Sequence, residues 1–144
     1  MSLLTPELRL ALRANAAQAQ AANARGLNFD PVPVVKFFNP VGAATWLATE
    51  LDDDGDTLFG LADLGFGCPE LGSFSLAEIE SVTLPFGLGI ERDLTFATVH
   101  PLSRWADVAR HQGSISRVEG WLWLAEVPPR HGPDPLPFPD PENG

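Results

Sequence analysis

Two carboxylates flank a glycine-rich stretch near the middle of the sequence and are the best candidates for acid–base chemistry. Asp63 and Glu70 stand on either side of residues 65–69, which are Gly-Phe-Gly-Cys-Pro. Paired carboxylates can act as general acid and general base when they lie close together and are partly buried. Across a tight corner, the two side chains could face one another. A small hydrolase-type enzyme that uses Asp63 and Glu70 is therefore one hypothesis for function.

A second acidic cluster precedes this corner, where four aspartates, Asp52, Asp53, Asp54 and Asp56, surround Gly55. Alternating carboxylates resemble part of a calcium-binding loop. However, the glycine does not stand where an EF-hand requires it, and no helix is expected before the cluster. We therefore expect an exposed turn and no metal site. If the cluster has a function, it is an acidic surface that meets a basic protein.

Three further patterns carry less information. Gly65 and Gly67 follow an expected strand, as in a dinucleotide-binding fingerprint, but the next helix cap is only at Ser75, so no helix begins at these glycines. Cys68 with His100 would be a thiol–imidazole pair, although a lone cysteine beside a proline is more often simply packed. The three histidines share no metal-ligand spacing. We expect no cofactor.

The elements that must position these residues begin with a hairpin. Residues 44–51 and 57–64 alternate small and large side chains around the Asp/Gly cluster, which predicts two antiparallel strands joined by a turn. Strict alternation places Leu47 and Leu51 on one face of the sheet and Trp46 on the other.

Capping patterns predict the helices. Thr5 followed by Pro6 opens an N-terminal helix that ends near Asn23. Ser75, with Glu78 three residues later, forms a capping box for a short helix. The remaining expected elements are strands at 34–38 and 94–96, a helix ending at 112, and an apolar run at 118–127 that is either an added strand or a segment docked on a neighbour.

The order of these elements predicts an α+β fold. We expect a small antiparallel β-sheet with a meander core, helices packed on one face and a helix at the N-terminus. Residues 1–127 are long enough for a single domain with one modest core. Residues 128–144 contain seven prolines, and we expect an extended proline-rich tail there.

The charge is distributed unevenly, and this limits the partners. Residues 31–100 contain eleven acidic residues against two basic ones, in a chain of net charge −10. A phosphate backbone requires clustered Lys and Arg, so we expect no nucleic-acid binding. The sequence contains neither an apolar run of about 18 residues nor a basic-then-apolar leader, so we expect a cytoplasmic protein without membrane contact.

Several blocks of the sequence, in order, resemble one known family. They are TPELR, ATWLATEL, FGLADLGFGCPELG, SLAEIESV and ERDLTF, and the resemblance covers roughly residues 4–116. This pattern is similar to a bacterial family of unknown function, DUF2958. The resemblance implies a protein carried on plasmids and other mobile elements, and it implies no catalytic residue. We therefore favour a non-enzymatic binding or accessory protein that acts through protein–protein contact, one version of which is an acidic decoy of nucleic acid.

Overall fold

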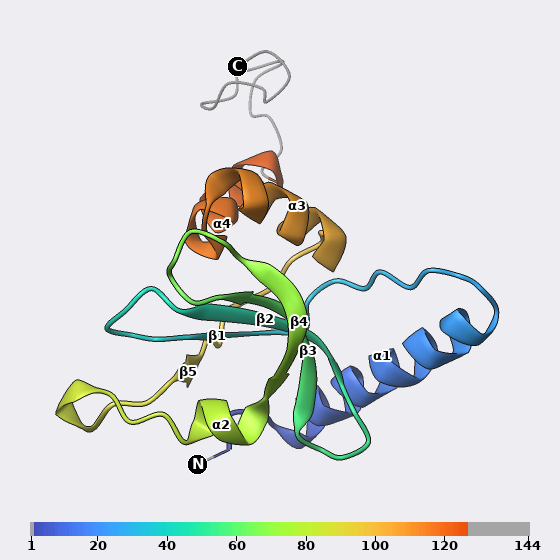
Figure 1. Ribbon diagram of the computed structural model, residues 1–144, viewed down its shortest axis with the longest axis horizontal. Coiled ribbons are helices and arrows are strands. Elements are labelled where there is room, and N and C mark those ends of the chain that lie inside the picture. Colours follow the sequence, from blue (N-terminus) through green and yellow to red (C-terminus); the bar gives the residue numbers. More distant parts are fainter. Residues whose placement is uncertain (1, 127–144) are drawn as a thin grey trace.

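Five strands form one antiparallel sheet with the spatial order β4-β3-β2-β1-β5 (Figure 1). The structure is a computed structural model, and it describes residues 2–126. The strands are β1 (Val35–Phe38), β2 (Thr45–Leu51), β3 (Thr57–Asp63), β4 (Glu70–Ser75) and β5 (Glu91–Arg92). The first four strands form the expected meander, and β5 then pairs with the remaining edge of β1. The predicted α+β class is confirmed.

The helices begin where the capping patterns predict. In α1 (Pro6–Ala24), the Thr5 side chain accepts a hydrogen bond from the backbone N–H of Leu8, at 3.2 Å. In α2 (Leu76–Glu80), Ser75 caps in the same way, accepting from the N–H of Glu78 at 3.2 Å. The remaining helices are a short 3-10 turn η1 (Pro85–Gly87), α3 (Leu102–Gln112) and α4 (Ile115–Glu126).

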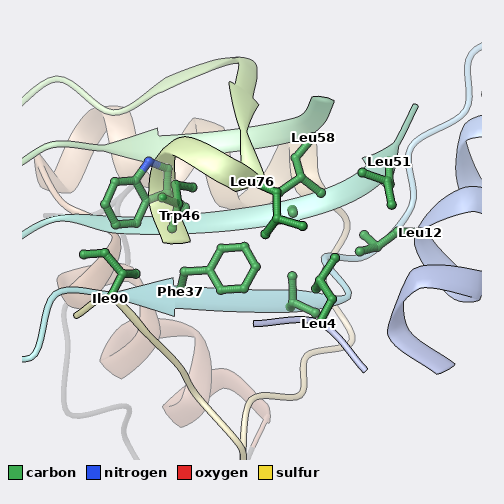
Figure 2. Close-up of a cluster of buried hydrophobic side chains, with 11 residues drawn as sticks. Leu4, Leu12, Phe37, Trp46, Leu51, Leu58, Leu76 and Ile90 are labelled. Atoms are coloured by element: carbon green, nitrogen blue, oxygen red, sulfur yellow. The ribbon is translucent and has the colours of Figure 1, made fainter. Parts of the chain in front are cut away.

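Helices cover both faces of the sheet, so the expectation that they pack on one face is wrong. Leu12 of α1 and Leu76 of α2 are buried in one cluster with Phe37 and Trp46 (Figure 2). The second cluster lies on the opposite face and consists of residues from β2, β3, α3 and α4: Leu47, Leu61, Leu102, Trp105, Ala106, Ala109, Ile115, Val118 and Leu122. Strand β2 is buried on both faces, which explains why it lacks the polar alternation of a one-sided sheet.

An irregularity in β2 changes which face its last residues occupy. The β2–β3 register shifts between Ala48 and Glu50, as at a β-bulge. As a result Leu51 packs in the same cluster as Trp46, whereas strict alternation predicted that it would share a face with Leu47. The Asn15 side chain on α1 donates to the carbonyl oxygen of Thr49 at 2.9 Å, so the bulge also anchors α1.

Two sequence assignments near the C-terminal end need correction. The apolar run at 118–127 is neither a strand nor a docking segment, because residues 118–126 lie within α4. Ile115, Val118 and Leu122 are buried at helical spacing and complete the second cluster. The expected strand at 94–96 is absent from the described chain, whose last strand is β5. The proline-rich segment 128–144 lies outside the described residues.

Candidate functional site

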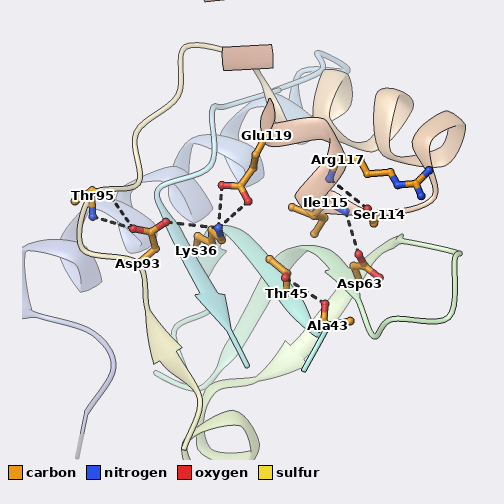
Figure 3. A network of polar contacts seen from close by, with 10 residues as sticks. All are labelled: Lys36, Ala43, Thr45, Asp63, Asp93, Thr95, Ser114, Ile115, Arg117 and Glu119. Carbon is orange, nitrogen blue, oxygen red and sulfur yellow. Dashed lines mark hydrogen bonds and ion pairs between the residues drawn. The ribbon is translucent and has the colours of Figure 1, made fainter. Parts of the chain in front are cut away.

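Asp63 is buried at the end of β3, with 1 % of its surface exposed. One carboxylate oxygen accepts a hydrogen bond from the backbone N–H of Gly65 at 2.9 Å. The other accepts from the N–H of Ile115 at 3.0 Å, at the first residue of α4 (Figure 3). A carboxylate at a helix N-terminus satisfies an otherwise unpaired N–H and interacts favourably with the helix dipole. Asp63 therefore holds the glycine-rich corner against α4.

Glu70 does not approach Asp63 in the manner that acid–base catalysis requires. Glu70 is exposed and pairs with Ala62 across the β3–β4 ladder, so its side chain shares a face with Ala62. Asp63 is the next residue along β3 and points to the opposite face. The structure thus separates the two carboxylates that the enzyme hypothesis brings together.

The corner between these carboxylates is the tight turn that its glycines predict. Gly65 and Gly67 both have positive φ, at 92° and 83°. Residues other than glycine rarely adopt this backbone conformation. Cys68 is exposed in the same turn.

The acidic cluster forms the β2–β3 turn, and two of its carboxylates stabilise local structure. Asp54 accepts hydrogen bonds from the backbone N–H groups of Asp56 and Thr57, both at 2.8 Å, and from the Thr57 hydroxyl at 2.6 Å. The hydrogen bond from the Thr57 hydroxyl, followed by those from the backbone, lowers the pKa of Asp54. Asp56 accepts from the Ser75 hydroxyl at 2.8 Å and from the N–H of Ala77 at 2.7 Å, at the start of α2.

Two arginines of α1 reduce the negative potential of this turn. Arg9 donates to the carbonyl oxygen of Gly55 at 3.3 Å, and Arg13 donates to that of Leu51 at 3.0 Å. Asp52 and Asp53 are exposed beside them. The exposed carboxylates of the acidic turn are therefore those of Asp52, Asp53 and Asp54, with positive charge close by.

Three connections lie at the opposite end of the sheet from this acidic turn, as the pairings of Phe38 with Thr45 and Glu91 and of Ala62 with Glu70 require. In Figure 1 all three lie on the left, with the β1–β2 turn between the β3–β4 corner on the side of α4 and the segment before β5 on the side of α2. A Cβ atom added at Gly65 would lie 3.1 Å from the Cβ of Ala43, so the first two connections touch. We call residues 39–44, 64–69 and 82–90 the loop end.

Large apolar side chains are exposed throughout the loop end. Val41 is 50 % exposed, Leu64 56 %, Phe66 83 % and Phe86 93 %. Single exposed apolar residues are ordinary on protein surfaces, whereas a group of them on one region marks an interaction site. Loops held by a rigid scaffold are also where binding residues concentrate.

Phe86 is both the most exposed of these residues and the most strained. Its backbone has φ 65° and ψ 22°, and Gly87 follows with φ 72°. The N–H of Leu88 donates to the carbonyl oxygen of Pro85 at 3.3 Å, which closes a tight turn. Turns with two positive φ values favour Asn or Gly at the position that Phe86 occupies. Strained backbone positions of this kind concentrate at functional sites.

Lys36 joins two acidic residues that are distant in the sequence. Its ammonium group donates to both oxygens of Glu119, at 2.7 and 2.9 Å, and lies 3.5 Å from a carboxylate oxygen of Asp93 (Figure 3). Burial alone would raise the pKa of Asp93, but the hydrogen bonds from Thr95 and the charge of Lys36 outweigh it and hold that pKa below its ordinary value. A lone lysine among the apolar residues of an expected strand was the sequence signal for this network.

The architecture defines an α+β protein whose antiparallel sheet is covered by helices on both faces. Comparison with known families gives one match, a model described as "Protein of unknown function (DUF2958)", over residues 3–116. The match covers most of the chain, so the protein belongs to this family, as the sequence blocks indicated. No curated protein matches the chain. No solved structure matches it either.

Metal clusters and membrane spans are the remaining features that would indicate a class of function. Within residues 2–126, no three His, Cys, Asp or Glu side chains converge as metal ligands would. None of the helices in that part of the chain combines the length and apolarity needed to cross a bilayer.

The exposed phenylalanines of the loop end are the feature that sequence reasoning missed. Their signal was a large aromatic residue next to glycine in each of two expected loops.

Proposed function

We propose that this protein is a non-enzymatic binding protein that acts through contact with another protein, and that the loop end is its contact surface. The observation that carries the proposal is the exposure of Phe66 on the β3–β4 corner and of Phe86 on the segment before β5, two of the three connections at one end of the sheet. Buried aromatic anchors supply much of the binding energy of protein interfaces. The sheet and its two helical layers would present these anchors on a rigid base.

The wider context of this proposal comes from the family. The resemblance to proteins of plasmids and other mobile elements suggests an accessory protein of a bacterial mobile element, with a cytoplasmic partner in the host or in the element itself. A nucleic-acid decoy has less support than an apolar contact, because Arg9 and Arg13 of α1 lie against the acidic turn and offset part of its negative charge. The hydrolase alternative has less support because Asp63 and Glu70 lie on opposite faces of β3 and β4.

Affinity capture from a host extract, followed by mass spectrometry, tests the proposal. We expect wild-type protein to retain a specific partner and the double variant Phe66→Ser/Phe86→Ser to lose about 90 % or more of it, as hot-spot removal predicts. The matched control is Leu10→Ser/Leu27→Ser, which removes two other apolar residues that are 72 % and 53 % exposed and leaves the loop end intact.

A third variant separates apolar contact from charge. Asp52→Asn/Asp53→Asn removes two exposed carboxylates of the acidic turn and keeps Asp54 and Asp56, whose hydrogen bonds hold the turn, and we expect it to retain the partner. Loss of the partner from this variant, with retention by Phe66→Ser/Phe86→Ser, would contradict our proposal and favour the acidic surface. Equal retention of the partner by the wild type and all three variants would also contradict the proposal.

A further inference from the structure

A cavity of about 360 Å³ lies on the second face of the sheet, between the segment after β5 and the helices α3 and α4. Its volume is in the range of small-ligand sites. Asp93 and Glu119 contribute carboxylates to its lining, Thr95 and Thr98 contribute hydroxyls, and Phe96 and Trp105 contribute aromatic rings. The cavity is distinct from the loop end, and its capacity to bind a ligand is independent of the function proposed for that surface.

The charged groups of the cavity leave an excess of negative charge. Lys36 is the cation paired with the two lining carboxylates, at 2.7 Å from Glu119 and 3.5 Å from Asp93. None of the lining residues in the described chain is Lys or Arg. Two carboxylates and one ammonium group leave about one negative charge unbalanced. A cationic group entering the cavity would therefore complete the charge balance.

The two carboxylates can accept more hydrogen bonds than the protein supplies. Asp93 already accepts from the N–H and hydroxyl of Thr95, at 3.0 and 2.9 Å. Each carboxylate offers about four lone-pair positions in total. Because both groups approach the same ammonium nitrogen, one planar donor with several N–H groups can reach them together. A guanidinium has this geometry, with five N–H donors in a fixed plane.

The aromatic part of the cavity suits the rest of such a ligand. The rings of Phe96 and Trp105 have centroids 6.0 Å apart and are tilted by 51°. The indole N–H of Trp105 donates to the Thr98 hydroxyl at 3.2 Å, so the polar edge of this ring is already satisfied. Trp105 is 3 % exposed and supports Phe96 from the core, whereas Phe96 is half-buried and offers ring surface to the cavity. The Phe96 ring can pack against methylene groups, and an aromatic face attracts a nearby cation.

We propose that this cavity is a binding site for an alkyl-guanidinium group, with the cation held by Asp93 and Glu119 and the alkyl part packed on Phe96. The same chemistry occurs in a free guanidinium compound and in an arginine side chain of another protein. Butylguanidinium and a blocked Gly-Arg-Gly peptide represent these two sources.

Isothermal titration calorimetry with these two probes tests the proposal. We expect butylguanidinium to bind at one site, and butylurea, its uncharged analogue, to bind at least about tenfold more weakly. If the peptide binds about tenfold more tightly than butylguanidinium, the natural ligand is an arginine of a partner. If the affinities are equal or the peptide binds more weakly, the natural ligand is a free small cation. Equal binding of butylguanidinium and butylurea would overturn the proposal, as would no binding of either cation.

Three variants locate the site. Glu119→Gln should weaken butylguanidinium binding about tenfold or more. Lys36→Met should strengthen it, because the competing cation is removed. The matched control, Glu91→Gln, changes the net charge equally at an exposed residue outside the cavity and should leave the affinity unchanged. Equal affinities for wild type and a folded Glu119→Gln protein would contradict the assignment.

Discussion

Replacing Gly60 by alanine is expected to abolish the folded sheet or to lower the free energy of unfolding by about 3 kcal/mol or more, the upper range for overpacking a core. Gly60 is buried in β3 and pairs with Ala48 on β2. A Cβ atom at this position would lie 1.8 Å from the carbonyl oxygen of Leu47 and 2.9 Å from the Cα of Ala48. These neighbours are backbone atoms of a central strand, so they cannot move aside as a flexible side chain can.

The neighbouring strand provides a matched control for this prediction. Gly72 is the direct partner of Gly60 on β4, and a Cβ added there would meet no atom within 4 Å. Gly72→Ala should therefore leave the unfolding free energy within about 0.5 kcal/mol of wild type, as is usual for surface substitutions. Urea denaturation monitored by tryptophan fluorescence measures both variants. Similar losses of unfolding free energy in Gly60→Ala and Gly72→Ala would show that the close approach of β2 and β3 does not cause the destabilisation.

Replacing Asp63 by alanine is the second change with a large expected effect. The substitution removes the acceptor of two backbone N–H groups, those of Gly65 and Ile115, and leaves the latter buried without its partner. An unsatisfied buried donor costs about 1–3 kcal/mol, and more when the lost acceptor is charged. We expect a loss of about 3 kcal/mol, with much faster amide hydrogen exchange in the first turn of α4.

Glu70→Ala is the control, because Glu70 belongs to the same corner and is exposed. We expect it to change the unfolding free energy by less than about 0.5 kcal/mol. The unfolding free energy of Asp63→Asn should fall between those of Asp63→Ala and Glu70→Ala, because the amide keeps one acceptor oxygen and places an N–H₂ group against a donor. If Asp63→Ala is as stable as Glu70→Ala, the buried carboxylate does not anchor α4.

Features that depend on neighbouring residues could be predicted from the sequence. The caps at Thr5 and Ser75 involve hydrogen bonds across three residues, and the structure contains both. The β2–β3 hairpin likewise results from alternation around an Asp/Gly turn. The positive φ of Gly65 and Gly67 is expected from their place in a corner beside a proline.

Features that depend on distant residues could not be predicted in this way. Asp63 looked catalytic beside a glycine-rich turn, but its second hydrogen-bond partner is 52 residues further along the chain. Lys36 and Glu119 are 83 residues apart. The bulge in β2 reverses the face of Leu51, and a pattern of strict alternation cannot reveal an inserted residue.

The C-terminal helix shows a different limit of sequence reasoning. Trp121 to Ala125 is a continuous apolar run, which favours a buried strand as well as a helix when it is considered alone. The residues that decide between strand and helix are Ile115, Val118 and Leu122, which are buried at helical spacing. The first two precede the apolar run. Because α4 covers the second face, its misassignment left out one of the two helices that make the sheet two-sided.

The central claim is that the loop end binds a partner protein, and Phe86→Asn tests it through two effects of opposite sign. Asparagine tolerates positive φ better than phenylalanine, and the Phe86 ring is almost wholly exposed. Relief of backbone strain without loss of packing should raise the unfolding free energy by about 0.5 kcal/mol or more. Removal of an aromatic anchor should weaken partner binding about tenfold or more.

The decisive measurement is the affinity of Phe86→Asn for the captured partner, determined by surface plasmon resonance together with its thermal midpoint. Our account predicts a higher melting temperature and an affinity reduced about tenfold. Leu10→Asn, which alters an exposed residue of α1, should leave the affinity unchanged. A Phe86→Asn protein that is at least as stable as wild type and binds the partner with undiminished affinity would contradict the account.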